Sequence, residues 1–314
     1  MKSKSWVELA SRILKCSQKD LAMKLKVSPT QITKWKNNEY MSRDFEERFE
    51  KITGLSKLKV NPEEVLKLGS VKDAKKWQKL VKSIADWVYE NDETGMVCEP
   101  LKDEDDLLSV QTLELFVELG INFPSDIPQA LNSDFDDDDE KFDDYFEHFF
   151  KDKFSSTIME IFTSYQNLYG FYSAYFYNDL MSNEMEDWYA DRGDDFELCL
   201  LELSATKVNI DPLFAPNIDK FKYKWIRQYQ DWIDELKNEL FVRGIPIKAE
   251  LTDLLEYSHD EVGREAEAYS LGFSRSRVHP DIYMNELLIG MRAIHSILPK
   301  ILEKLEIEIE SINE

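Results

Sequence analysis

The sequence predicts an all-α protein in which a small amino-terminal domain is followed by a larger, acidic helical domain. Only 10 Gly and 10 Pro are spread over 314 residues, and long stretches repeat apolar residues every three or four positions. Charge separates the two domains. Residues 1–60 contain 14 Lys and Arg against 7 Asp and Glu, whereas the other residues contain 25 against 55. Such asymmetry favours two different partners, one of them nucleic acid.

The first helix of a closely packed pair is predicted to begin after Ser17, whose side chain is a favoured helix cap. Its inward-facing residues are Leu21, Ala22 and Leu25, which recur at helical spacing. Because Ala22 is small, a second helix can cross close to it. Val27 then lies in a short turn as a buried apolar residue.

A second helix is predicted to follow at once, with Ser28 as its cap and Pro29 at its first position. Ile32 and Trp35 lie three residues apart and face the core. This leaves short polar and cationic side chains on the outer face, which are of the types that contact base edges and phosphates: Thr30, Gln31, Thr33, Lys34 and Asn37.

This segment resembles the helix-turn-helix of Cro and lambda-repressor-like (XRE-type) DNA-binding domains. The likeness lies at Gln18, Leu21, Ala22, Leu25, Val27, Ser28, Ile32 and Trp35. It implies a preceding helix over Trp6 to Leu14 and a helix over Arg43 to Ile52 that packs from behind, in a domain that ends near residue 60. It also implies that the first helix of the pair contacts the DNA backbone and that the second reads the major groove.

The residues expected to contact double-stranded DNA are therefore Gln18, Lys19, Ser28, Thr30, Gln31, Thr33, Lys34, Lys36 and Asn37. Charge supports this expectation, because residues 1–36 carry nine Lys and Arg against only Glu8 and Asp20. Cations that neutralise phosphates release counterions from the duplex, which favours binding.

Three residues depart from the pattern of the resembled family. Lys26 stands where the turn glycine is common, and a lysine there must take a strained positive φ. Asn38 also replaces a glycine, but Asn tolerates the left-handed conformation. Lys36 replaces a frequent Glu and adds positive charge where the DNA would lie.

Beyond the first domain, the sequence predicts a basic connecting helix within residues 61–100 and an acidic, aromatic-rich helical domain over residues 101–314. The connecting helix has one apolar stripe from Val71 to Glu90. The further helices are predicted over Asp103 to Leu119, Phe154 to Met185, Ile218 to Leu240, Ile247 to Leu271 and Pro280 to Leu298, with an interruption at Pro299. The tail from Leu302 to Ile312 is read as a helix, with a strand over Leu305 to Ile309 as the alternative.

Two segments of the acidic domain have unusual composition. The run from Asp136 to Glu140 is read as a solvated loop, with capture of a divalent cation or mimicry of a phosphate backbone as the alternatives. Residues 135–189 contain 17 Phe, Tyr and Trp, including the stretch from Gly170 to Tyr177. Core packing is the main interpretation of these aromatic residues, and a ligand pocket or a partner groove is the alternative.

No catalytic, cofactor or metal motif is found. The sequence lacks HExxH, G-x-S-x-G and a phosphate-binding glycine loop, so we expect no enzyme, no cofactor and no metal. The densest polar group is read as surface ion pairs and a polar loop, with a metal or phosphate site as the alternative; it comprises His259, Asp260, Glu261, Arg264, Glu265, Ser274, Arg275, Ser276, Arg277, His279 and Asp281.

The expected compartment is the reducing cytoplasm. Cys16, Cys98 and Cys199 are far apart without CxxC spacing, so neither a disulfide framework nor a zinc site is indicated. No window is long and apolar enough for a membrane span, and the amino terminus lacks the apolar run of a signal peptide.

The first functional hypothesis is a dimeric, sequence-specific transcriptional regulator whose acidic region forms the dimer or receives a small-molecule or basic-protein signal. The candidate dimer helices are Val71 to Glu90, the helix near Tyr165, and the C-terminal helix from Met284. The second hypothesis is an antitoxin-like or defence-associated protein whose acidic domain masks a basic partner. A DNA-tethered enzyme of unknown reaction is the third.

Overall fold

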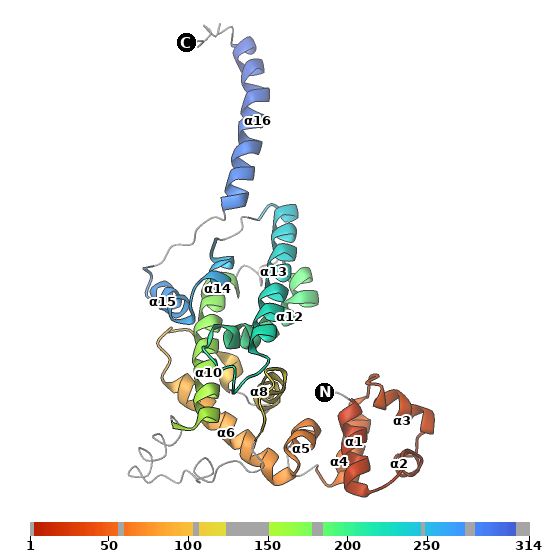
Figure 1. The fold of residues 1–314 in the computed structure, drawn as a ribbon. Coiled ribbons are helices and arrows are strands. Elements are labelled where there is room, and N and C mark those ends of the chain that lie inside the picture. Colours follow the sequence, from red (N-terminus) through yellow and green to blue (C-terminus); the bar gives the residue numbers. More distant parts are fainter. Residues whose placement is uncertain are drawn as a thin grey trace. The chain divides into compact units, whose positions relative to one another are not determined.

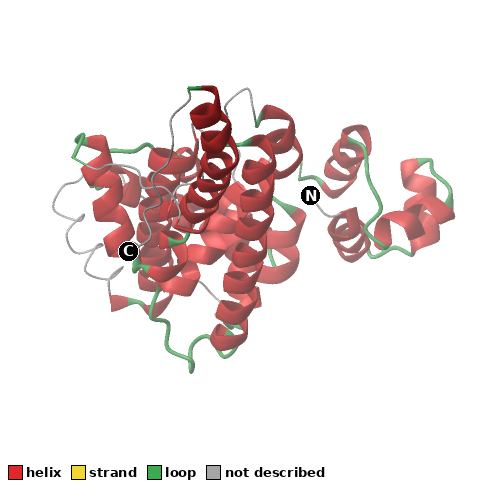
Figure 2. Cartoon of the chain, turned by 90° about the horizontal axis from the view of Figure 1, so that it is seen from above, coloured by secondary structure: helices red, strands yellow, loops and turns green. Residues whose placement is uncertain are grey.

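A computed structural model describes residues 3–55, 60–102, 107–123, 151–177, 185–245, 249–273 and 280–305. Within these ranges every regular element is a helix, which confirms the predicted all-α class (Figures 1 and 2). The first elements are α1 (Ser3–Leu14), α2 (Gln18–Leu25), α3 (Pro29–Lys36), α4 (Arg43–Thr53), α5 (Pro62–Leu68), α6 (Val71–Glu90), α7 (Glu99–Lys102) and α8 (Leu107–Glu118). The later ones are α10 (Lys153–Tyr172), the π-helical turn η2 (Ser173–Tyr177), α12 (Glu186–Lys207), α13 (Ile218–Arg243), the 3₁₀ turn η3 (Ala249–Leu251), α14 (Asp253–Glu256), α15 (His259–Ser270) and α16 (Pro280–Lys304).

The chain divides into two compact units, each formed from several stretches of the sequence. Unit 1 contains Met1–Asn91, Cys98–Thr163 and Val208–Phe221, and unit 2 contains Asp92–Val97, Ser164–Lys207 and Lys222–Glu314. The predicted boundaries at residues 60 and 100 stay predictions.

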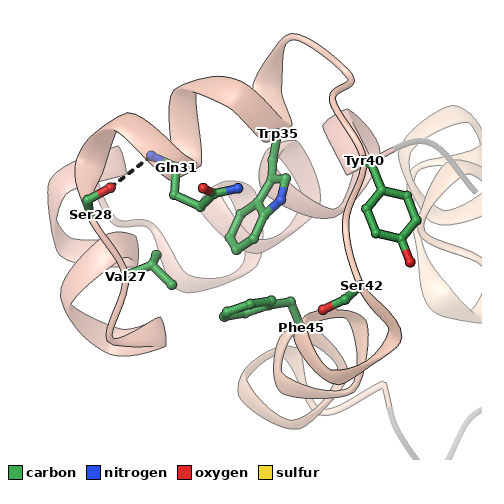
Figure 3. Close-up of a pocket in the computed structure, with 7 residues that line it drawn as sticks. All are labelled: Val27, Ser28, Gln31, Trp35, Tyr40, Ser42 and Phe45. Atoms are coloured by element: carbon green, nitrogen blue, oxygen red, sulfur yellow. Dashed lines mark hydrogen bonds between the residues drawn. The ribbon is translucent and has the colours of Figure 1, made fainter.

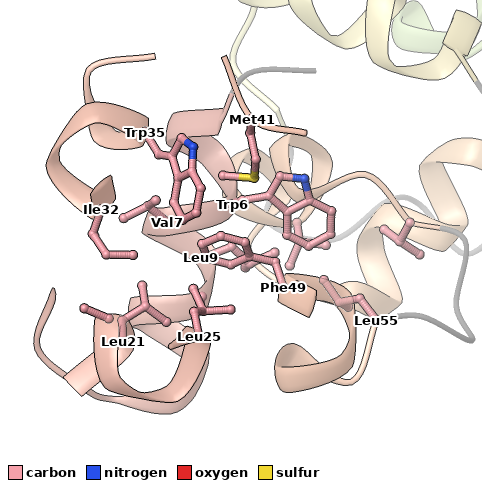
Figure 4. Close-up of a cluster of buried hydrophobic side chains, with 14 of the residues drawn as sticks. Trp6, Val7, Leu9, Leu21, Leu25, Ile32, Trp35, Met41, Phe49 and Leu55 are labelled. Carbon is pink, nitrogen blue, oxygen red and sulfur yellow. The ribbon is translucent and has the colours of Figure 1, made fainter. Parts of the chain in front are cut away.

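Helices α1 to α4 surround an aromatic core, and we call these four helices the head (Figure 4). The rings of Trp6 and Phe49 have centroids 6.1 Å apart, and Trp35 meets the same Phe49 ring edge-on at 5.8 Å. The same buried cluster includes Val65 of α5 and Ala74 of α6. The core of the head therefore continues into the two helices that follow it.

A buried carboxylate connects α5 to its neighbours in unit 1. Glu64 is fully buried, and its oxygens accept hydrogen bonds from the Ser109 hydroxyl at 2.5 Å and the Gln78 amide at 2.8 Å. It also accepts from the backbone N–H of Asn61 at 3.2 Å and thereby caps α5. Next to this network, the Trp77 indole donates to the carbonyl of Ser109 at 2.8 Å.

In unit 2, two glycines allow segments of the chain to pack closely against each other. A Cβ on Gly170 would lie 2.9 Å from Thr94 Oγ1, and one on Gly263 would lie 2.5 Å from Asn167 Oδ1. The aromatic stretch after Gly170 is mostly buried, with Phe171, Tyr172, Ala174, Tyr175 and Phe176 in the core. Core packing, the main interpretation of these rings, is thereby confirmed for this stretch.

The predicted helices agree with the structure where their end signals are strong. The helix from Val71 to Glu90 is confirmed with the same bounds. The helix from Ile218 is confirmed and ends before Gly244, which takes the left-handed conformation at φ 71°. Gly120 likewise ends α8 at φ 76°.

Three predictions about helices are wrong or incomplete. The single helix from Ile247 to Leu271 is wrong, because Ser258 caps a separate helix through a reciprocal pair of hydrogen bonds with Glu261. The interruption at Pro299 is also wrong, since α16 continues through it to Lys304. Helices α5 and α12 were not among the predicted elements. The run from Asp136 to Glu140 and residues 274–279 lie outside the described residues.

Candidate nucleic-acid interface

Helix α2 begins with the predicted cap. The Ser17 hydroxyl accepts a hydrogen bond from the backbone N–H of Asp20 at 3.2 Å, and the Asp20 carboxylate accepts from the backbone N–H of Ser17 at 3.1 Å. The Ser17 hydroxyl also donates to this carboxylate at 2.6 Å, and these hydrogen bonds lower the pKa of Asp20 below its usual value. Two of the orphan N–H groups at the start of α2 are thereby satisfied.

The turn between α2 and α3 takes the geometry that its sequence suggested. Lys26 lies in the left-handed region at φ 57° and ψ 45°, and its backbone N–H donates to Met23 at 3.2 Å. The next N–H, of Val27, donates to the carbonyl of Ala22 at 3.0 Å. The Val27 side chain is half-buried and packs against the core of the head. A lysine therefore adopts a left-handed backbone conformation that glycine takes without strain and that is unfavourable for most residues with a Cβ.

Helix α3 is anchored by two large side chains. Ile32 and Trp35 are buried almost completely in the head, and the Ser28 hydroxyl accepts from the backbone N–H of Gln31 at 3.2 Å. Pro29 occupies the first position of the helix, as predicted. These contacts fix the rotation of α3 about its axis and decide which of its residues face solvent.

The structure exposes most of the nine expected contact residues. Gln18 and Gln31 are half-buried, and the exposed ones are Lys19, Ser28, Thr30, Thr33, Lys34, Lys36 and Asn37. We call these nine residues the α2–α3 polar face. Besides Ser28, which caps α3, two side chains of this face have partners within the head: the Thr33 hydroxyl donates to the carbonyl of Pro29 at 3.1 Å, and Lys34 Nζ lies 3.6 Å from Glu39 Oε2.

A shallow groove of about 390 Å³ lies along α3, between this helix and the start of α4 (Figure 3). It is lined by Val27, Ser28, Gln31, Trp35, Tyr40, Ser42 and Phe45. The side chain of Gln31 bends toward the Trp35 ring, which explains why this predicted contact residue is half-buried. Tyr40 is 87% exposed beside the groove.

Tyr40 and Ser42 were not among the predicted site residues, although one signal in the sequence pointed to them. Asn38 takes the left-handed conformation at φ 66°, as expected for a residue that replaces glycine, and its N–H donates to the carbonyl of Trp35 at 3.0 Å. This bend ends α3 and leads the chain past the groove. An exposed Tyr directly after such a bend has no role in the core.

Positive charge dominates the exposed surface of the α2–α3 pair. Besides the three lysines of the polar face, Lys24 and Lys26 are exposed on the same two helices and their turn. The acidic residues nearest in sequence are Asp20, which caps α2, and Glu39, which pairs with Lys34. Exposed cations of this kind attract a polyanion, and salt screens that attraction.

The polar group around His259 forms a helix cap and side-chain contacts. His259 Nδ1 lies 3.3 Å from Asn167 Nδ2 and 3.3 Å from Asp260 Oδ1, while Glu261 caps α15. In the part of the chain that the structure describes, no three His, Cys, Asp or Glu side chains are placed to hold a metal ion. None of the described helices has the length and apolar content needed to cross a bilayer.

No family model matches the chain, and neither a curated protein nor a solved structure shows significant similarity to it.

Proposed function

We propose that the protein is a sequence-specific DNA-binding regulator whose head inserts α3 into the major groove of duplex DNA. The observation that carries this proposal is the exposure of the outer side of α3 on a helix anchored by Ile32 and Trp35. A helix held rigidly by its core with short polar and cationic side chains outward has the form that major-groove recognition requires.

The polar face divides into two roles in this proposal. Lys19 and Lys36 are exposed cations that contact phosphates, and Lys34 joins them once it exchanges Glu39 for a phosphate. Gln31 and Asn37 carry amides, which can pair with the edge of adenine in the major groove. Phosphate contacts set the affinity, while amide contacts set the preferred sequence.

The number of contacts that one head makes is small, so we propose that the regulator binds as an oligomer. Two heads related by a two-fold axis would occupy half-sites about 34 Å apart, one turn of the duplex. The rest of the chain, with its excess of acidic residues, is repelled by DNA and remains available for a signal molecule or a basic protein.

The test begins with selection of bound sequences from a random duplex library by the full-length chain, followed by gel shifts across a salt titration. Lys34→Ala should weaken binding and make the log–log salt slope shallower by about 0.9, the value for one phosphate contact. Gln31→Ala should broaden the selected sequences more than it weakens binding.

Lys51→Ala is the matched control, because Lys51 is exposed on α4 and lies outside the polar face. It should leave the slope unchanged. Equal binding by wild type, Lys34→Ala and Gln31→Ala would exclude this face as the DNA-contacting surface. A chain that selects no sequence at low salt would refute the proposed function itself.

A further inference from the structure

Helix α16 presents large apolar side chains to solvent along its described length. From Leu287 to Leu305 no residue is buried. Leu302 is half-buried, and the other large apolar residues in this stretch are 44% to 61% exposed, namely Leu287, Leu288, Ile289, Met291, Ile294, Ile297, Leu298, Ile301 and Leu305. Continuous apolar surface of this extent on a soluble protein marks an interaction site.

The spacing of these residues identifies the kind of partner. Starting from Leu287, apolar residues recur at intervals of four, three, four, three and four, at Met291, Ile294, Leu298, Ile301 and Leu305. This is a heptad repeat, with Leu or Met at the a positions and Leu or Ile at the d positions. Such a stripe fits the same stripe on another helix, where each side chain enters a hole between four others.

Charged residues are arranged so that they do not oppose this pairing. Arg292, Lys300 and Glu303 fall at outer positions of the heptad, and Pro299 also lies on the outer side. The positions that flank the stripe hold mainly apolar residues, among them Leu288 and Ile297. Lys304 is the one Lys, Arg, Asp or Glu at a flanking position from Leu287 to Leu305, so two copies of α16 can approach with few like charges beside the stripe.

The size of the exposed surface is also that of a stable interface. The eight exposed large apolar residues on the stripe and its flanks, which exclude Ile289 on the outer side, offer on the order of 700 Å², close to what one partner buries in a contact of standard size. A lipid surface is a poorer match, because the chain has a net charge of −23 and anionic membranes repel it.

We propose that the chain self-associates through α16, whose apolar stripe packs against α16 of a second copy. Leu298 at an a position next to Ile294 and Ile301 at d positions, with apolar flanks, favours three or four strands over two. The expected solution mass is therefore a multiple of the chain mass of 37.0 kDa. This inference deepens the proposed function, because it supplies the second head, yet it holds independently of DNA binding.

Light scattering coupled to size exclusion tests the proposal on the full chain at micromolar concentration without DNA. Wild type should elute at three or four chain masses, and a mass of two chains would support the α16 contact with a two-stranded stripe. Ile294→Glu with Leu298→Glu places a charge in two adjacent layers of the stripe and should reduce the mass to that of one chain. Ser296→Glu, on the outer side of the same helix, is the matched control and should keep the wild-type mass.

Circular dichroism and thermal unfolding of the double variant establish that the rest of the chain stays folded. A wild-type mass of one chain would overturn the proposal and would leave another protein as the occupant of α16. An unchanged mass in the folded double variant would also overturn it, since association would then use another surface.

Gel shifts with the selected DNA separate this inference from the proposed function. A monomeric double variant that still binds a single half-site weakly supports both. A chain that self-associates through α16 and binds no DNA would support the α16 contact and refute the regulator.

Discussion

Lys34 Nζ lies 3.6 Å from Glu39 Oε2, so a cation of the α2–α3 polar face is paired within the head itself. Glu39→Gln should release Lys34 for a phosphate, tighten DNA binding, and make the log–log salt slope steeper by about 0.9. The free energy of unfolding should change by less than about 1 kcal/mol, because both side chains are exposed. Gel shifts and chemical denaturation measure the two quantities.

Glu47→Gln provides the control for this prediction, since Glu47 is exposed on α4 and its substitution changes net charge equally. An equal gain in affinity from both variants would mean that overall charge, and not release of Lys34, is responsible.

Lys26 occupies the left-handed region at φ 57°, where a Cβ is unfavourable. Lys26→Gly should raise the free energy of unfolding by about 0.5 kcal/mol. The substitution relieves the backbone strain, but part of this gain is offset because glycine increases the conformational entropy of the unfolded chain. Lys26→Ala loses the same side chain but keeps the Cβ, and it should give no gain. Thermal unfolding of both variants measures the effect, and equal stability would show that the backbone here is not strained.

Glu64 is buried and accepts hydrogen bonds from Ser109 and Gln78. Glu64→Ala should lower the free energy of unfolding by about 3 kcal/mol, because it leaves a cavity and removes the acceptor for these two groups. Glu64→Gln keeps the shape and one acceptor oxygen and should cost less. Urea denaturation ranks the three proteins, and an alanine variant as stable as wild type would contradict the importance of this network.

Lys207 is half-buried in unit 2 and donates to the carbonyls of Leu255 and Tyr257. Burial lowers the pKa of Lys207 from 10.5 to about 8, an effect that outweighs the attraction of Glu261. Between these two pH values the unfolded chain binds more protons than the folded chain, so the free energy of unfolding rises with pH. The full gain is at most about 3 kcal/mol, at 1.36 kcal/mol per pKa unit.

The comparison with Lys207→Met isolates this contribution. The stability of wild type relative to the variant should increase as pH rises from 8 toward 10, and denaturant titrations at several pH values follow it. A difference that stays constant over this range would contradict the effect of burial on Lys207.

Local signals in the sequence were sufficient for much of the fold. Helix α6 was predicted with its observed bounds because its apolar stripe is regular, and the structure shows Ser70 as its cap. Helix α5 was missed although Asn61 and Glu64 have the spacing of a capping box, because seven residues are too few to show a period. The apolar spacing continues without interruption past Ser258, but Ser258 caps a new helix there, so the chain forms separate helices before and after it.

The site was predictable as far as helical period determines it. Exposure of Thr30 and Lys36 follows from the burial of Ile32 and Trp35 on the opposite side of α3. The pairing of Lys34 and the position of Gln31 over the groove depend on the course of the chain after Asn38. Such tertiary contacts cannot be derived from the period of one helix.

The buried cluster that runs from Trp6 through Val65 to Ala74 has a consequence for dissecting the chain. A fragment that ends at residue 60 would lack α5 and α6, and the apolar side chains of α1 that pack against them would be exposed to solvent. The smallest fragment that keeps this cluster buried therefore extends through α6, and a shorter fragment would tend to aggregate.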